Sequence, residues 1–224
     1  MALTATTGNA ATRIDIKNPE GVATVYIDGA RSRMDNGEQG YMILDSQANS
    51  MQLVMPAQRQ VIDMSFALHV PQPGSESVKL NFTKTGTGPR IAGYETSRYN
   101  FSADDQQCGS LLGSTAALKD AKLGEALEMM EKMAKRSAAM VSSFRAVAPC
   151  ERATTALSQY AAEVGLPMRV TIGKQVLSEI VRLEPDARLP PNTFTVPAGY
   201  QRQNPAQMMQ GAQRLMQQMQ QSGQ

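Results

Sequence analysis

Residues 14–99 form a series of short segments in which apolar and polar side chains alternate, separated by residues that favour turns. Within residues 21–28, for example, Val25 and Ile27 fall on one side and their polar neighbours on the other. A period of two is typical of β-strands with one buried face. The strands predicted in this way are residues 21–28, 31–35, 41–45, 51–56, 61–66, 78–83 and 91–101. Their hairpin spacing predicts antiparallel pairing.

After Ser114 the apolar side chains recur at helical spacing instead. The stripe consists of Leu123, Leu127, Met130, Ala134, Val141 and Phe144. It predicts an amphipathic helix over residues 115–145. Pro149 is a typical first residue of a second helix, which Gly165 ends. Strands return at residues 166–172, 176–183 and 194–196. This order predicts one α+β domain, a half-open antiparallel β-barrel in which a two-helix insertion of about residues 115–164 covers the concave face.

Composition divides the chain into three parts. Residues 1–13 are polar and are expected to be disordered, residues 14–200 form the single domain, and residues 201–224 are a Gln/Met-rich tail. The tail has one apolar face at helical spacing, made of Met208, Ala212, Leu215, Met216 and Met219. Two interpretations stay open: this face docks on a partner or in the domain's own cavity, or the tail is disordered.

Charge argues against nucleic acid as the main partner. The formal net charge is +2, and the tail, which contains Arg202 and Arg214 but no acid, accounts for all of it. A neutral body offers no footprint for phosphate backbones. No apolar run approaches the roughly 18 residues of a transmembrane helix, so any membrane contact is expected to be peripheral.

The patterns of common catalytic sites are missing from the sequence. His69 is the single histidine, and no Ser or Cys motif accompanies it. The segment 86–88 lacks the third glycine of a dinucleotide-binding loop, and the segment 109–113 lacks the Gly-x-Ser-x-Gly order of a nucleophile elbow. We therefore expect no enzyme activity, no catalytic residue and no cofactor.

Methionines are numerous, fifteen in all, and four of them cluster in the first predicted helix: Met129, Met130, Met133 and Met140. Thioethers are soft ligands that suit Cu(I), but flexible methionine side chains also fill adaptable apolar surfaces. We favour the second interpretation and expect no metal site.

Arg31 and Arg33 lie on one side of a predicted strand beside the first hairpin turn. They are candidate contacts for an anionic group near a cavity mouth. The alternative, which we favour, is that they are exposed charges that discourage aggregation between strand edges.

Cys108 and Cys150 are the only cysteines, and neither lies in a CxxC motif. They are either one structural disulfide or two unrelated buried thiols. Because both stand where predicted sheet meets the helical insertion, we predict a bond that ties the loop 102–113 to the start of the second helix. Such a bond persists in oxidising compartments. We expect an exported, periplasmic protein whose signal peptide is absent from this chain.

Several segments resemble a widespread group of exported bacterial proteins catalogued as a domain of unknown function. They are residues 25–35 (VYIDGARSRMD), 91–96 (IAGYET), 165–170 (GLPMRV) and 194–200 (FTVPAGY), with Cys108. That group is similar to the lipoprotein-carrier fold of LolA and LolB. The resemblance implies a half-open antiparallel barrel whose apolar concave face is covered by helices and holds acyl chains. It implies no catalytic residue.

Together these features predict a non-enzymatic periplasmic carrier or binder of a lipid-like or acylated ligand. The residues expected to line its cavity are Leu123, Leu127, Met130, Met133 and Val141. The alternative is a periplasmic adaptor or chaperone-like protein, which binds another protein through the helical insertion and the tail.

Overall fold

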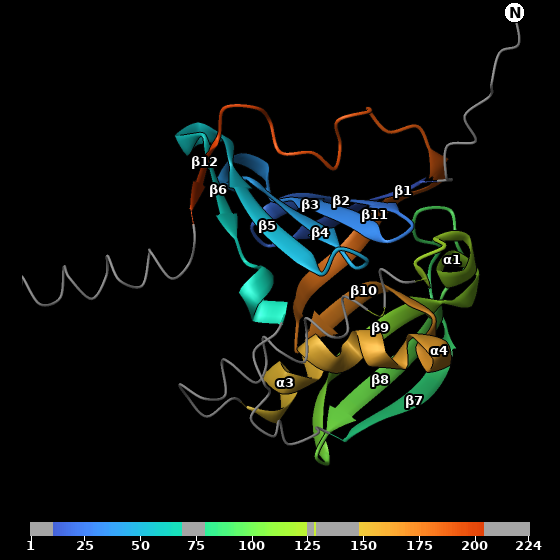
Figure 1. Cartoon of the computed structure of the whole chain (residues 1–224). Helices are drawn as coiled ribbons and strands as arrows, with labels where there is room; N and C mark the ends of the chain where they lie inside the picture. Colours follow the sequence, from blue (N-terminus) through green and yellow to red (C-terminus); the bar gives the residue numbers. More distant parts are fainter. Residues whose placement is uncertain (1–10, 69–78, 125–127, 129–147, 204–224) are drawn as a thin grey trace, which may run out of the picture.

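One curled, open β-sheet forms the body of the protein (Figure 1). The computed structural model describes residues 11–68, 79–124, 128 and 148–203. Within them the sheet has twelve strands in the order β12-β6-β5-β4-β3-β2-β1-β11-β10-β9-β8-β7. The bounds are β1 Ala11–Asn18, β2 Gly21–Asp28, β3 Arg31–Asp35, β4 Tyr41–Asp45, β5 Ser50–Met55, β6 Gln60–Asp63, β7 Leu80–Thr87, β8 Ser97–Ala103, β9 Gln106–Ser114, β10 Leu166–Ile172, β11 Gln175–Ala187 and β12 Gln201–Gln203.

Neighbouring strands are antiparallel throughout, except that β12 runs parallel to β6. The two outermost strands, β12 and β7, do not pair with each other, so the described sheet is not closed. A mostly antiparallel, open sheet with few helices confirms the predicted fold class at this level.

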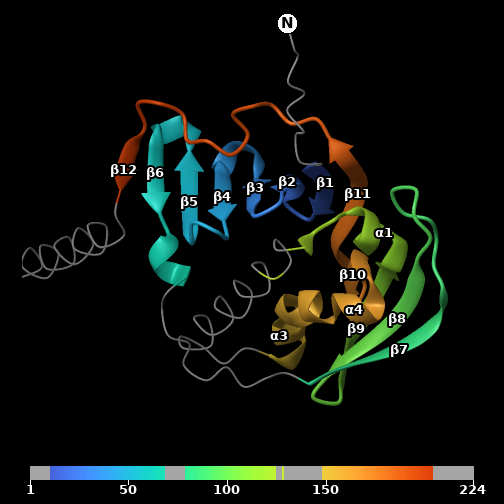
Figure 2. The same ribbon diagram turned by 45° about the vertical axis from the view of Figure 1, so that its right-hand side comes forward.

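Short helices lie against one arm of the sheet (Figure 2). The α-helices are α1 Thr115–Asp120, α3 Pro149–Ala156 and α4 Ala161–Val164, and the 3₁₀ turns are η1 Gly37–Gln39, η2 Pro56–Gln58, η3 Ser65–Leu68 and η4 Leu157–Tyr160. Helix α3 contacts β8 and β9, whereas α1 and α4 contact β10. As predicted, Pro149 opens the second helical segment and Gly165 follows its end, although η4 interrupts the segment.

The inner face of the sheet carries the core. Ile14, Val25 and Ile27 from β1 and β2 are buried in one cluster with Ala117 of α1 and Met168 of β10. A second cluster joins β7–β10 to α3, η4 and α4, and its buried members are Leu80, Phe101, Ala103, Cys108, Leu111, Ala153, Leu157, Val164 and Val170. The helices therefore cover the inner face beside the β7–β11 arm, where apolar side chains of the chain itself fill the space.

The outer face of the β1–β6 arm is crossed by residues 188–200, which we call the strap (Figure 1). Phe194, Val196 and Tyr200 of the strap pack on a cluster that includes Tyr41 and Val54. The strand predicted for residues 194–196 is wrong, because these residues form a turn, a bend and irregular backbone instead of pairing with the sheet.

Strand β9 was not expected, because residues 102–113 were predicted to form a loop. Gly109 and Gly113 have no side chains, so they interrupt the alternation of apolar and polar residues that predicts a strand. Each is needed for close packing: a Cβ at Gly113 would collide with the carbonyl oxygen of Val164, and one at Gly109 with that of Thr171. The predicted Cys108 loop is therefore part of the sheet.

Several predicted boundaries also need correction. Residues 11–13, expected to be disordered, belong to β1, and residues 201–203, assigned to the tail, form β12. The helix predicted over 115–145 is interrupted after α1 ends at Asp120, because Lys122 has a left-handed backbone with a φ of 48°. Gly124 and Glu128 are helical again. Residues 125–127 and 129–147 lie outside the described residues, as does most of the predicted tail.

Candidate functional site

The predicted disulfide is present between Cys108 and Cys150. It joins β9 to the first turn of α3, so it links the sheet to the helical segment as expected. Close to it, a guanidinium nitrogen of Arg152 lies 3.2 Å from a carboxylate oxygen of Asp104. Both contacts fasten α3 to the β8–β9 hairpin. The bond is thus a structural element at the base of the helical segment.

Arg31 and Arg33 lie on the outer face, where both contact the strap. The guanidinium group of Arg31 lies 4.9 Å from the ring centroid of Phe194 and pairs with Asp28 at 2.6 Å. Arg33 pairs with Asp35 and donates a hydrogen bond of 3.1 Å to the carbonyl oxygen of Thr193. These contacts give both arginines a structural role. Because β3 pairs with both β2 and β4, the favoured interpretation as charges at a strand edge is wrong. Contact with an anionic ligand stays an untested candidate.

Of the residues expected to line a cavity, only Leu123 is described. It is buried in the core cluster with Ala117 and Ala121. Leu127, Met130, Met133 and Val141 lie outside the described residues, as does His69.

Five apolar side chains form a continuous row across the inner face of the β2–β6 arm, which we call the apolar row: Val25, Met34, Met42, Leu53 and Ile62. The strand register pairs each with the next, from β2 through β3, β4 and β5 to β6. None of the five is charged or aromatic. The row spans about 19 Å, given a strand spacing of about 4.8 Å.

Burial changes along the apolar row. Val25 and Ile62, at its two ends, are buried with 4% and 7% exposure, whereas Met34 is 36% exposed and Met42 and Leu53 are half-buried. Next to them, Leu44, Met51 and Leu68 form a small buried cluster. The centre of the row is thus an accessible apolar surface between buried residues at its two ends.

Signals for this surface were present in the sequence. Val25, Met34 and Leu53 fall on the apolar side of predicted strands, but their alignment depends on the register between strands. The sequence alone did not give that register.

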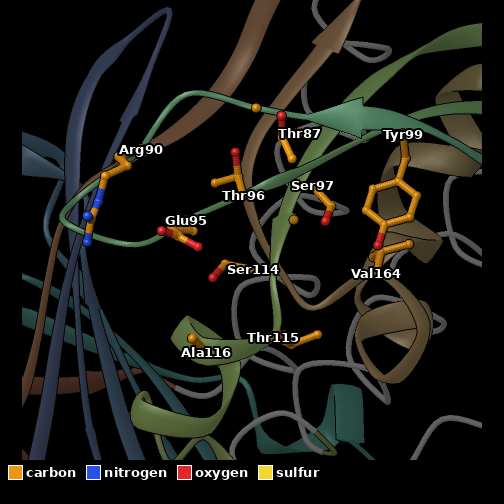
Figure 3. Close-up of a pocket in the computed structure, with 12 residues that line it drawn as sticks. Thr87, Arg90, Glu95, Thr96, Ser97, Tyr99, Ser114, Thr115, Ala116 and Val164 are labelled. Carbon is orange, nitrogen blue, oxygen red and sulfur yellow. The ribbon is translucent and has the colours of Figure 1, made fainter.

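A separate pocket of about 480 Å³ lies where the connection between β7 and β8 meets the start of α1 and the end of α4 (Figure 3). Its lining is largely hydroxylated: Thr87, Thr96, Ser97, Tyr99, Ser114 and Thr115 contribute hydroxyl groups. Arg90 and Glu95 add one charge of each sign. This pocket differs in chemistry from the apolar cavity that the sequence predicts.

No helix among the described residues is long and apolar enough to span a membrane. In the same part of the chain, no group of three or more His, Cys, Asp or Glu side chains is arranged to hold a metal ion.

Comparison with protein families shows which family the chain belongs to. Residues 1–200 match the family described as Domain of unknown function (DUF4412). The chain belongs to this family. Membership confirms the resemblance to a group catalogued as a domain of unknown function. No curated protein matches this DUF4412 chain.

Two kinds of solved structure resemble the DUF4412 chain at low similarity. The structure of PNGF-II in the C2 space group matches with 12% identity and a TM-score of 0.40, over 87% of this chain and 31% of that one. The crystal structure of MucB matches with 12% identity and a TM-score of 0.39, over 86% of this chain and 59% of that one. The DUF4412 chain thus spans less than two thirds of either protein.

Proposed function

We propose that this protein is a non-enzymatic periplasmic carrier or binder that holds a lipid-like or acylated ligand on the apolar row. The observation that carries the proposal is the exposure of Met34, at 36%, in the middle of a row whose ends are buried. Contiguous apolar surface in contact with water is unfavourable by roughly 25 cal/mol per Å², and it commonly marks a binding surface.

The chemistry of the row suits an acyl chain. Aliphatic and thioether side chains offer dispersion contacts but no strong hydrogen bond. They can therefore contact any part of a hydrocarbon chain equally well. Met34 and Met42 are adjacent across the β3–β4 pair, and flexible methionines adapt to ligands of differing shape. A row of about 19 Å is long enough for an extended acyl group.

The disulfide supports the proposed compartment. A bond between Cys108 and Cys150 persists in oxidising environments and is rare in the cytosol. The sequence resemblance to exported proteins similar to LolA and LolB supports the same location and the acyl ligand.

The proposal is tested on full-length protein purified from its native host. Denaturation, organic extraction and mass spectrometry should release a lipid in a near-stoichiometric amount, and the emptied protein should bind a fluorescent fatty acid. Protein that yields no lipid and does not bind the fatty acid would overturn the proposal. An unrelated disulfide-bonded periplasmic protein, extracted in parallel, controls for carried-over membrane lipid.

The adaptor function stays a second candidate, supported by the position of β12. Residues Gln201–Gln203 pair with β6 at the edge of the sheet, so the segment that follows starts from a fixed point. Deleting residues 204–224 leaves β12 in place. If the adaptor hypothesis holds, this deletion abolishes recovery of a defined partner and leaves thermal stability and fatty-acid binding unchanged.

A further inference from the structure

The pocket at the β7–β8 connection has a floor made of two buried hydroxyl groups. Thr96 is 5% exposed and Ser114 is 2% exposed, and both line the pocket. Thr96 directly precedes β8 and Ser114 ends β9, and the two lie next to the paired residues Ser97 and Gly113. Buried hydroxyls are costly unless hydrogen-bonded, so the partners of these two groups define what the floor offers.

The two floor hydroxyls offer opposite hydrogen-bonding roles. Thr96 Oγ1 donates to the carbonyl oxygen of Pro89 at 2.8 Å, so it can only accept a hydrogen bond from a ligand. Ser114 Oγ instead accepts from the backbone N–H of Ala117 at 3.2 Å, which leaves its hydroxyl proton to donate. The floor therefore presents one acceptor and one donor side by side.

The pocket walls are mixed and carry no net charge. Figure 3 shows Glu95, Ser114 and Thr115 around one opening, with Tyr99 and Val164 at its far side. The Glu95 carboxylate is exposed and can accept hydrogen bonds from a ligand. The half-buried ring of Tyr99 gives one wall a flat apolar surface next to these polar groups.

The loop that forms the pocket rim is fixed in place. Ile91 and Tyr94 exchange two backbone hydrogen bonds of 3.0 and 2.9 Å, and the Tyr94 hydroxyl contacts a carboxylate oxygen of Asp120 in α1 at 3.2 Å. Arg90 donates to the carbonyl oxygen of Gly93 at 2.7 Å. These bonds all join residues of the chain itself, so the fold holds the pocket rim.

We propose that this pocket binds a neutral polyhydroxylated group, such as a sugar ring. A hydroxyl group of a ligand both donates and accepts hydrogen bonds, so it matches the acceptor on Thr96 and the donor on Ser114. The Tyr99 ring can pack against the apolar face of a sugar. A volume of about 480 Å³ falls within the range of small-molecule sites, about 300–1,000 Å³. An acyl chain would leave Thr96 and Ser114 without ligand partners. The charges of Arg90 and Glu95 cancel, so the lining favours neither an anion nor a cation. The inference is independent of the acyl ligand proposed for the apolar row.

The experiment follows amide shifts of the full-length protein by two-dimensional NMR during titration with glucose, N-acetylglucosamine and maltose. Binding to vesicles that contain a galactosyl diglyceride, compared with binding to phosphatidylcholine vesicles, tests whether the sugar ring is recognised as part of a lipid headgroup. Saturable shifts confined to residues 87–99 and 113–116, or binding to the galactolipid vesicles only, support the proposal. No response to any sugar and equal binding to both vesicle types overturn it.

Two variants assign the response to the pocket. Glu95→Gln and Thr96→Val should each weaken binding of the responsive probe by about tenfold. Thr85→Val is the matched control, because Thr85 is an exposed β7 threonine outside the pocket lining. Glu95→Gln changes an exposed side chain and should fold normally. Equal affinity for Glu95→Gln, Thr85→Val and the unchanged protein would contradict the assignment. Fatty-acid binding should be the same in all three.

Discussion

The guanidinium carbon of Arg33 lies 3.6 Å from the centroid of the Tyr41 ring. The two residues stand on neighbouring strands, β3 and β4, and face the strap, whose Thr193 carbonyl oxygen accepts a hydrogen bond from Arg33. Burial raises the pKa of Tyr41, and the nearby Arg33 cation only partly offsets this rise. The Arg33 side chain thus makes a cation–π contact with Tyr41 and also holds the strap, which leads to β12, against the sheet.

Replacing Arg33 should loosen the strap. Arg33→Met removes the cation–π contact and the hydrogen bond to Thr193, and we expect a loss of about 1–3 kcal/mol in the free energy of unfolding. Urea denaturation measures this loss, and hydrogen exchange of the Gln201 amide, which bonds to the Arg59 carbonyl oxygen at 2.9 Å, reports on the strap.

Arg31→Met is the matched control for this prediction. The Arg31 side chain is 49% exposed, against 19% for Arg33, so its replacement should cost less than half as much. Equal losses in the two variants would show that Arg33 has no special part in fixing the strap.

The disulfide should contribute substantially to stability. Cys108 and Cys150 are separated by 42 positions, and closing a loop of that length contributes about 4 kcal/mol in the chain-entropy account. The double variant Cys108→Ser/Cys150→Ser should unfold at correspondingly lower urea concentration. Thiol counting on denatured, unreduced protein from the native host should find no titratable thiol, and two titratable thiols would contradict both the bond and the proposed compartment.

Acid should weaken the β10–β11 pair. The Arg169 guanidinium makes two hydrogen bonds of 2.8 Å to the Glu179 carboxylate, and this contact lowers the pKa of Glu179. Stability from a carboxylate with a lowered pKa is present above its ordinary value of about 4.3 and is lost as pH falls through the lowered value. Glu179→Gln should therefore destabilise the protein at pH 7 more than at pH 3.

Arg169→Met should reproduce this pH dependence, and the double variant should lose little more than either single one. Urea titrations at the two pH values provide the measurement. Additive losses, or the same loss at both pH values, would mean that the pair is not the source of the effect.

The fold was predictable where side chains alternate cleanly. Strand β2 has the predicted bounds because Val25 and Ile27 are buried on one face, whereas Thr24 and Tyr26 lie on the other. Strand β9 was missed because Gly109 and Gly113 lack the side chains that create a pattern, although close packing against Thr171 of β10 and Val164 of α4 requires them. The local sequence pattern thus predicts strands whose side chains are buried on one face. It misses strands in which glycines allow the backbone itself to pack closely.

The candidate sites were harder to predict than the fold. The apolar row depends on register, since Met34 and Leu53 come together only through Met42 between them. The hydroxylated pocket depends on Thr96 and Ser114, which look like ordinary turn and capping residues in the sequence. The cysteine pair was predictable because both residues stand at junctions between predicted elements.

The most direct test of the acyl-binding account is the affinity of a fluorescent fatty acid for Met34→Gln compared with Val22→Gln. Val22 is 55% exposed on β2 and falls on the opposite face from Val25, so it is an exposed apolar side chain outside the apolar row. The account predicts that Met34→Gln weakens binding by about tenfold, or about 1.4 kcal/mol, while Val22→Gln leaves it unchanged. Equal affinity in the two variants would contradict binding on the apolar row.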